Sequence, residues 1–66
     1  MFSQRLKELR LEKKLYQSQL AKELNVDRTT VVKWEKNEQE TDFATLIKIA
    51  DFFDVSIDFL LGRKDY

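Results

Sequence analysis

The sequence lacks three residue types that carry much of protein chemistry: histidine, cysteine and proline. Without cysteine there is no disulfide bond and no zinc finger or zinc ribbon. Without histidine or cysteine there is also no Ser–His or Cys–His nucleophile pair and no histidine metal ligand. One glycine and no proline favour helices over sheets and tight turns. No metal, no cofactor and no nucleophile pair of these two kinds is therefore expected.

The chain is also short, and its 66 residues are expected to form a single domain spanning 1–66. No signal peptide is expected, since residues 1–5 have no apolar run, and no stretch approaches the about 20 apolar residues that span a bilayer. A soluble chain without cysteine is compatible with the cytoplasm. A helical domain this small leaves little room for a pocket of about 300 Å³, so an enzyme is not expected.

An excess of charge of one sign is missing overall, because 12 basic and 12 acidic side chains cancel. The two halves nevertheless differ. Residues 1–36 hold nine basic and five acidic side chains, a net charge of +4, whereas residues 37–66 hold three basic and seven acidic, a net charge of −4. This asymmetry indicates a half that faces a polyanion. A chance imbalance between solvated helix faces explains it equally well.

Apolar residues recur at helical spacing along nearly the whole chain and predict five short helices, an all-α fold. Ser3 marks the start of the first helix, Asp27, Asp42 and Ser56 are expected to cap the last three, and Gly62 ends the fifth. The expected inner faces are Phe2, Leu6 and Leu9; Leu20, Ala21 and Leu24; Val31 and Trp34; Phe43, Leu46, Ile47, Ala50 and Phe53; and Ile57, Leu60 and Leu61.

The second and third helices, which begin near Gln17 and Asp27, are joined by a link of about residues 25–26. A turn of about three or four residues between two short helices is typical of a helix-turn-helix, here about residues 17–36. Asn25 tolerates the left-handed conformation that such a turn often needs. Any small helical domain has tight turns, so the spacing alone is weak evidence for DNA binding.

The third helix has a polar face suited to the major groove of DNA. Arginine and lysine donate to guanine O6 and N7, threonine bonds either way, and an exposed valine methyl contacts the thymine methyl. An ordinary solvated face is the alternative, although an exposed valine fits it poorly. The residues opposite the apolar stripe, or in the first turn, are Arg28, Thr29, Val32, Lys33 and Lys36.

Two charged residues fall on apolar stripes: Arg10 lies four residues after Leu6, and Glu35 four residues after Val31. Unpaired burial of either charge is costly, so we expect an Arg10–Glu35 ion pair between the first and third helices. The alternative is that both side chains extend to solvent. Conversely, Phe52 and Phe59 lie across their helices from the apolar stripes, which indicates either a partner surface or packing within the chain.

Four segments together resemble one known family. Residues 17–24 (QSQLAKEL) and 25–35 (NVDRTTVVKWE) resemble the helix-turn-helix of Cro/CI-type, lambda-repressor-like regulators of the XRE family. Residues 45–50 (TLIKIA) and 55–62 (VSIDFLLG) are similar to that family's fourth and fifth helices. The resemblance implies a compact five-helix DNA-binding domain, most often a dimeric transcriptional repressor in bacteria, phages or mobile elements.

The resemblance also implies roles for particular residues. The partners implied are double-stranded DNA with a near-palindromic operator and a second copy of the chain. An antitoxin or a protein-interaction module with the same fold is the alternative. The family often has Thr or Ser where Tyr16 stands, and tyrosine cannot cap the second helix in that way. The roles carried over are base reading by Arg28, Thr29 and Lys33, with Val32 nearby; phosphate binding by Gln17, Lys36 and Asn37; the Arg10–Glu35 ion pair; and a dimer contact through Phe52 and Phe59.

Overall fold

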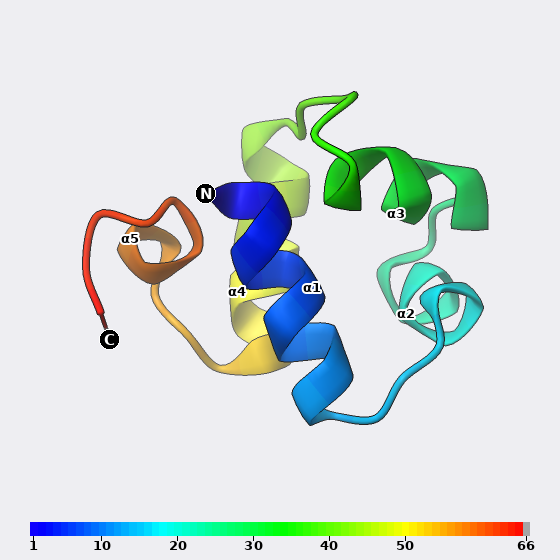
Figure 1. Ribbon diagram of the computed structural model, residues 1–66, viewed down its shortest axis with the longest axis horizontal. Coiled ribbons are helices and arrows are strands. Elements are labelled where there is room, and N and C mark those ends of the chain that lie inside the picture. Colours follow the sequence, from blue (N-terminus) through cyan, green and yellow to red (C-terminus); the bar gives the residue numbers. More distant parts are fainter. Residues whose placement is uncertain (66) are drawn as a thin grey trace.

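The computed structural model describes residues 1–65, which form five helices and no strand (Figure 1). This confirms the all-α prediction. Within residues 1–65 no helix is long and apolar enough to cross a membrane. The helices are α1 (Phe2–Glu12), α2 (Gln17–Leu24), α3 (Arg28–Glu35), α4 (Phe43–Phe53) and α5 (Ile57–Leu60).

The start of α1 differs from the prediction, because Met1 and not Ser3 holds the N-cap position. The Met1 carbonyl accepts a hydrogen bond from the backbone N–H of Arg5 at 3.0 Å, so the helix is already formed at Phe2. The Phe2 ring packs edge-on against Trp34, with ring centroids 6.4 Å apart. This contact holds the first turn of α1 against α3 without a polar cap.

Two of the three predicted caps make the expected hydrogen bond. Asp42 Oδ1 accepts from the backbone N–H of Thr45 at 3.0 Å, and Ser56 Oγ accepts from the backbone N–H of Phe59 at 3.0 Å. Asp27 stands at the N-cap position of α3, but its side chain makes no capping bond. That part of the cap prediction is wrong, and the carbonyl of Asp27 alone receives the first α3 hydrogen bonds.

The Asp42 cap makes the start of α4 sensitive to acid. Hydrogen bonds from the side chain and backbone of Thr45 hold the pKa of the Asp42 carboxyl below its ordinary value. A lowered pKa in the folded state means that the stabilisation is present above the unfolded pKa of about 3.9 and is lost as the pH falls through the lower folded value. We therefore expect the first turn of α4 to fray below about pH 4.

An NMR titration of the Thr45 amide signal measures this loss. The acid step in the Thr45 shift is expected in the wild-type chain and should vanish in Asp42→Asn, because asparagine caps a helix without titrating. A Thr45 signal that stays constant in the wild-type chain through this range contradicts the prediction.

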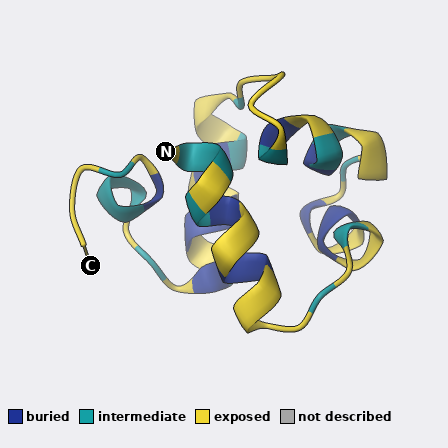
Figure 2. Ribbon diagram, in the orientation of Figure 1, coloured by how far each residue is buried: buried dark blue, intermediate teal, exposed yellow. Residues whose placement is uncertain are grey.

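A single apolar core lies between the helices (Figure 2). In this arrangement α3 packs chiefly against α1 and α2, while α4 packs against α2 and α5. Helix α1 contacts α5 as well as α3, so it lies between α5 and the α2–α3 pair (Figure 1). The side chains that are most completely buried come from all five helices and are Leu6, Leu20, Leu24, Val31, Ile49 and Leu60.

The inner face of α4 is rotated from the predicted one. Phe43 is 84% exposed and Ile47 is 49% exposed, whereas Ile49 is fully buried. The prediction failed because α4 contains two overlapping stripes with the same i, i+3, i+4, i+7 spacing, and only packing against α2 and α5 selects between them. The first stripe is Phe43, Leu46, Ile47 and Ala50, and the buried one is Leu46, Ile49, Ala50 and Phe53.

The exposure predicted for Phe52 and Phe59 is wrong, because both side chains are half-buried against the core. Phe52 packs edge-on against Phe53, with ring centroids 5.0 Å apart. The guanidinium of Arg5 lies 4.3 Å from the centroid of the Phe59 ring. Packing within the chain, the alternative considered above, accounts for both rings.

Leu61 follows the end of α5 and is 41% exposed, so its predicted place inside is also wrong.

Candidate nucleic-acid interface

The link between α2 and α3 forms the short turn that the sequence predicted. Asn25 adopts the left-handed conformation with φ of 58°, and the backbone N–H of Val26 donates to the Ala21 carbonyl at 2.9 Å. This hydrogen bond closes the end of α2 within two residues of Leu24. Helix α3 begins at Arg28, after the N-cap residue Asp27. The turn therefore places α3 beside α2 as a helix-turn-helix (Figure 1).

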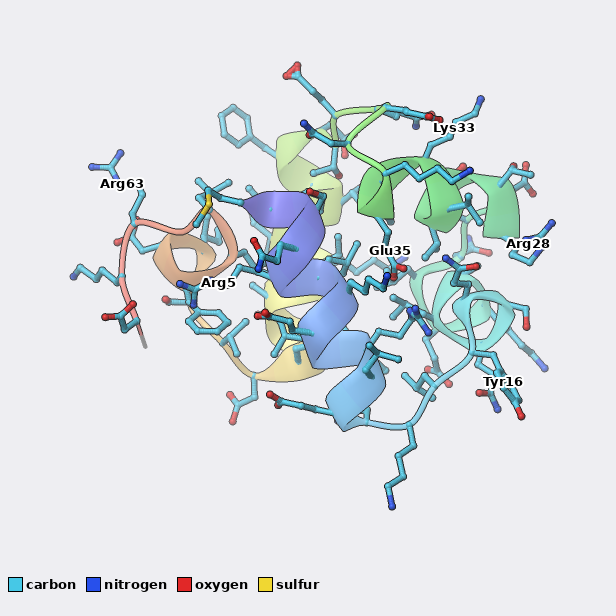
Figure 3. All side chains as sticks on the ribbon, in the orientation of Figure 1. Arg5, Tyr16, Arg28, Lys33, Glu35 and Arg63 are labelled. Atoms are coloured by element: carbon cyan, nitrogen blue, oxygen red, sulfur yellow. The ribbon has the colours of Figure 1, made fainter. Side chains whose placement is uncertain are left out.

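Helix α3 divides into a buried and an exposed face as expected. Val31 and Trp34 are buried in the core. Arg28, Thr29 and Lys33 are exposed. The side chains of Arg28 and Lys33 project away from the body of the protein (Figure 3). Val32 is only half-buried, so the fully exposed valine expected from the helical spacing is not observed.

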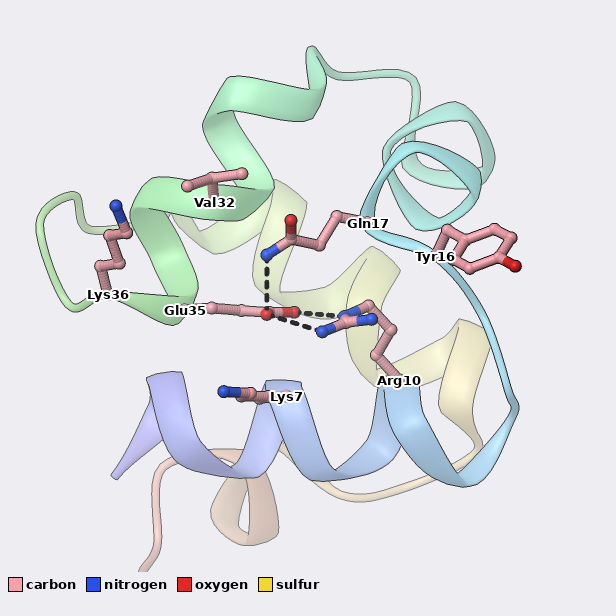
Figure 4. Close-up of a pocket in the computed structure, with 7 residues that line it drawn as sticks. All are labelled: Lys7, Arg10, Tyr16, Gln17, Val32, Glu35 and Lys36. Atoms are coloured by element: carbon pink, nitrogen blue, oxygen red, sulfur yellow. Dashed lines mark hydrogen bonds and ion pairs between the residues drawn. The ribbon is translucent and has the colours of Figure 1, made fainter.

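The structure brings Arg10 and Glu35 together in a bidentate ion pair between α1 and α3 (Figure 4). Arg10 Nε donates to Glu35 Oε2 at 2.7 Å, and Arg10 Nη2 donates to Glu35 Oε1 at 3.0 Å. Arg10 Nη1 donates to the Leu15 carbonyl at 2.8 Å. The two side chains are 10% and 4% exposed. Two parallel hydrogen bonds of this kind restrict how α1 and α3 lie relative to each other.

Gln17 extends this pair into a network of three helices. Its Nε2 donates to Glu35 Oε1 at 3.1 Å, so the first residue of α2 is tied to the last residue of α3 (Figure 4). The family resemblance implied a phosphate contact for Gln17, and in some members a base contact. The structure shows that one amide hydrogen is already used inside the protein, which orients the rest of the amide.

An open hollow of about 350 Å³ surrounds this network. The Arg10 charge balances the Glu35 carboxylate, so the ammonium groups of Lys7 and Lys36 make the electrostatic potential in the hollow positive. Lys7 was missed by the sequence reasoning, although its position three residues before Arg10 places both on one face of α1. The lining residues are Lys7, Arg10, Tyr16, Gln17, Val32, Glu35 and Lys36.

Tyr16 occupies the N-cap position of α2 at the rim of this hollow. Gln19 Oε1 accepts from the backbone N–H of Tyr16 at 2.7 Å, which secures the helix start in place of a Ser or Thr cap. The Tyr16 side chain is 76% exposed and points away from the Glu35 network (Figure 4). Asn37, the other predicted phosphate ligand, lies just beyond α3 in a left-handed conformation and is exposed.

A second hollow, of about 310 Å³, lies on the other flank of α3 and includes Thr30, Glu40 and Asp42. Helix α3 is thus bordered by a basic hollow on one side and an acidic one on the other. Little room for a pocket of about 300 Å³ was expected; these two hollows reach that volume as open depressions of the surface. Both hollows are open to solvent, and residues 1–65 contain no group of three or more His, Cys, Asp or Glu residues placed to hold a metal.

Comparisons with known proteins match this geometry. A family model described as helix-turn-helix matches residues 6–60. The chain is 43% identical over 61 residues to the uncharacterised HTH-type transcriptional regulator YqaE of Bacillus subtilis, covering 92% of this chain and 53% of that protein. It is 41% identical over 64 residues to the HTH-type transcriptional activator BcrR of Enterococcus faecalis, covering 97% and 31%.

The fold is also that of a solved repressor. The P22 c2 repressor, in a crystal structure with a synthetic operator, superimposes with a TM-score of 0.89 at 25% identity and 97% coverage of both chains. Because the family match spans α2 to α5 and most of α1, this chain belongs to the helix-turn-helix family. The prediction of a five-helix, lambda-repressor-like fold is confirmed. The chain spans 53% and 31% of the length of the two relatives.

Proposed function

We propose that this chain is a sequence-specific, double-stranded-DNA-binding transcriptional regulator, and that it represses a bacterial, phage or mobile-element promoter. The observation that supports this most strongly is the exposed face of α3, with Arg28, Thr29 and Lys33 beside a basic hollow. A helix of this kind fits the major groove, where arginine and lysine read guanine. A regulator of this kind acts in the cytoplasm, at the nucleoid.

In this proposal one set of side chains reads the bases and another binds the phosphates. Arg28, Thr29 and Lys33 contact base edges, and the methyl groups of Val32 lie nearby. Phosphate contacts set the position of the protein on the duplex but carry no sequence information directly. The residues proposed for them are Gln17, Lys36 and Asn37, with Lys7 added from the structure.

Repression in this proposal requires two copies of the chain. A homodimer would place two α3 helices in successive major grooves, about 34 Å apart, on a near-palindromic operator. The dimer would then block RNA polymerase by occupying the promoter. The face formed by α4 and α5 is the proposed contact. Since Phe52 and Phe59 are half-buried, they contribute less surface to it than the sequence indicated.

Selection of bound sequences from a random DNA pool tests this function. We expect enrichment of a two-fold symmetric sequence whose half-sites are about one helical turn apart. Recovery of the pool without any preferred sequence would reject a sequence-specific regulator and favour the protein-interaction module. Enrichment of a single half-site would retain base reading and reject the dimer.

The basic hollow makes a separate prediction about salt dependence. Lys36→Ala and Lys7→Met should each reduce the slope of log K against log salt concentration by about one unit, since each removes one phosphate contact. Binding to all sequences should weaken by a similar factor. The control is Lys64→Ala, which removes one positive charge beyond α5 and should leave the slope unchanged. Fluorescence anisotropy at several salt concentrations measures all three variants, and an unchanged slope for Lys7→Met would remove that residue from the phosphate site.

A further inference from the structure

Lys48 is the only basic residue among residues 37–62, where six acidic residues also lie. Lys48 is an exposed residue of α4 whose side chain reaches the end of α2. Lys48 Nζ donates a hydrogen bond to the Leu24 carbonyl at 3.1 Å. Leu24 is the last residue of α2, so this bond joins the middle of α4 to the turn of the helix-turn-helix.

The Leu24 carbonyl lies at the C-terminal end of α2, where backbone N–H groups reach only some of the carbonyls of the last turn. The backbone N–H groups of Asn25 and Val26 reach the carbonyls of Lys22 and Ala21. Carbonyls of the last turn have no partner within the helix, and they carry the negative end of the helix dipole. An ammonium group is therefore well suited to this position, because it supplies both a donor and a positive charge.

Two contact routes connect α4 to α3: one runs through α2, and the other through α5 and α1. Helix α3 packs chiefly against α1 and α2, and α4 packs against α2 and α5. The way in which the end of α2 is held on α4 is therefore one of the contacts that set the orientation of α3 relative to α4 and α5, and it is the one that Lys48 makes. Lys48 supplies a directional bond there, whereas apolar packing between α2 and α4 has no directional preference.

We propose that Lys48 is a positioning residue for DNA recognition: it holds the α2–α3 turn on α4 and so sets the orientation of the reading helix. This inference rests on the proposed DNA-binding function. Lys48 does not contact DNA in this role, because its ammonium group is directed at the Leu24 carbonyl. Its loss therefore affects binding to the operator more than binding to unrelated sequences.

Three variants of the 66-residue chain test this role. Lys48→Met removes the donor and keeps the length of the stem, and Lys48→Arg restores a charged donor. Lys22→Met is the matched control, because it removes one exposed positive charge from the last turn of α2. For Lys48→Met we expect about three- to tenfold weaker binding to the selected operator, with random DNA bound as in Lys22→Met and an unchanged salt slope. Lys48→Arg should recover most of the operator binding.

The outcomes separate positioning from other roles. A salt slope reduced by about one unit in Lys48→Met would make Lys48 a phosphate contact and overturn the proposal. Equal losses on operator and random DNA would overturn it as well. Amide hydrogen exchange at Asn25 and Val26, measured without DNA, should be faster in Lys48→Met than in Lys22→Met. Equal exchange rejects the proposal, whereas faster exchange in a chain that selects no operator rejects the proposed function alone.

Discussion

Glu35→Ala is expected to lower the free energy of unfolding by about 3–5 kcal/mol. The variant leaves the Arg10 guanidinium, whose side chain is 10% exposed, without its carboxylate partner. Gln17 loses the acceptor of its side-chain amide in the same step. A single core in a domain this small rarely supplies more than about 3–5 kcal/mol, so the variant is expected to be largely unfolded at room temperature.

Urea unfolding followed by tryptophan fluorescence measures this loss, since Trp34 is the only tryptophan, is buried and directly precedes Glu35 in α3. The double variant Arg10→Met with Glu35→Leu should recover much of the stability, because no charge is then buried without a partner. Glu23→Ala is the control at an exposed glutamate and should change stability by less than about 0.5 kcal/mol. A loss below about 1 kcal/mol in Glu35→Ala would show that the ion pair is not structurally important.

Arg28→Ala is expected to weaken binding to the selected operator by about 1–3 kcal/mol, which corresponds to roughly 5- to 150-fold. Arg28 is the first residue of α3, is exposed and projects from the protein (Figure 3). An arginine at this end of a reading helix can bind guanine O6 and N7 with two hydrogen bonds. Its loss should therefore relax the preference at one base pair of each half-site and leave the other positions unchanged.

Repeating the pool selection with the variant measures that preference directly. The control is Arg63→Ala, which removes the same charge at the opposite end of the molecule (Figure 3). Arg63→Ala should keep the selected sequence and most of the affinity. If Arg28→Ala weakens binding to every sequence equally, Arg28 contacts the backbone and not a base.

The elements nearest the proposed function were predictable because their causes are local. The apolar spacing and the single residue Asn25 in the turn are sufficient to indicate α2, α3 and the short link between them. The Arg10–Glu35 pair was also predictable, since unpaired burial of either charge on an apolar stripe is costly and mutual pairing avoids that cost. The basic hollow was not, because Lys7 enters it only when α1 lies across the Glu35 end of α3.

Sequence alone therefore determined the five helices, the helix-turn-helix and the chemical character of the exposed face of α3, because helix periodicity depends on residues within a few positions of one another. Tertiary structure decided which of two equally regular stripes of α4 is buried, and it partly buried both Phe52 and Phe59 against the core. It also decided where Lys48 bonds. Burial and such contacts join residues far apart in the chain, and helical spacing carries no information about which neighbouring helix each face will meet.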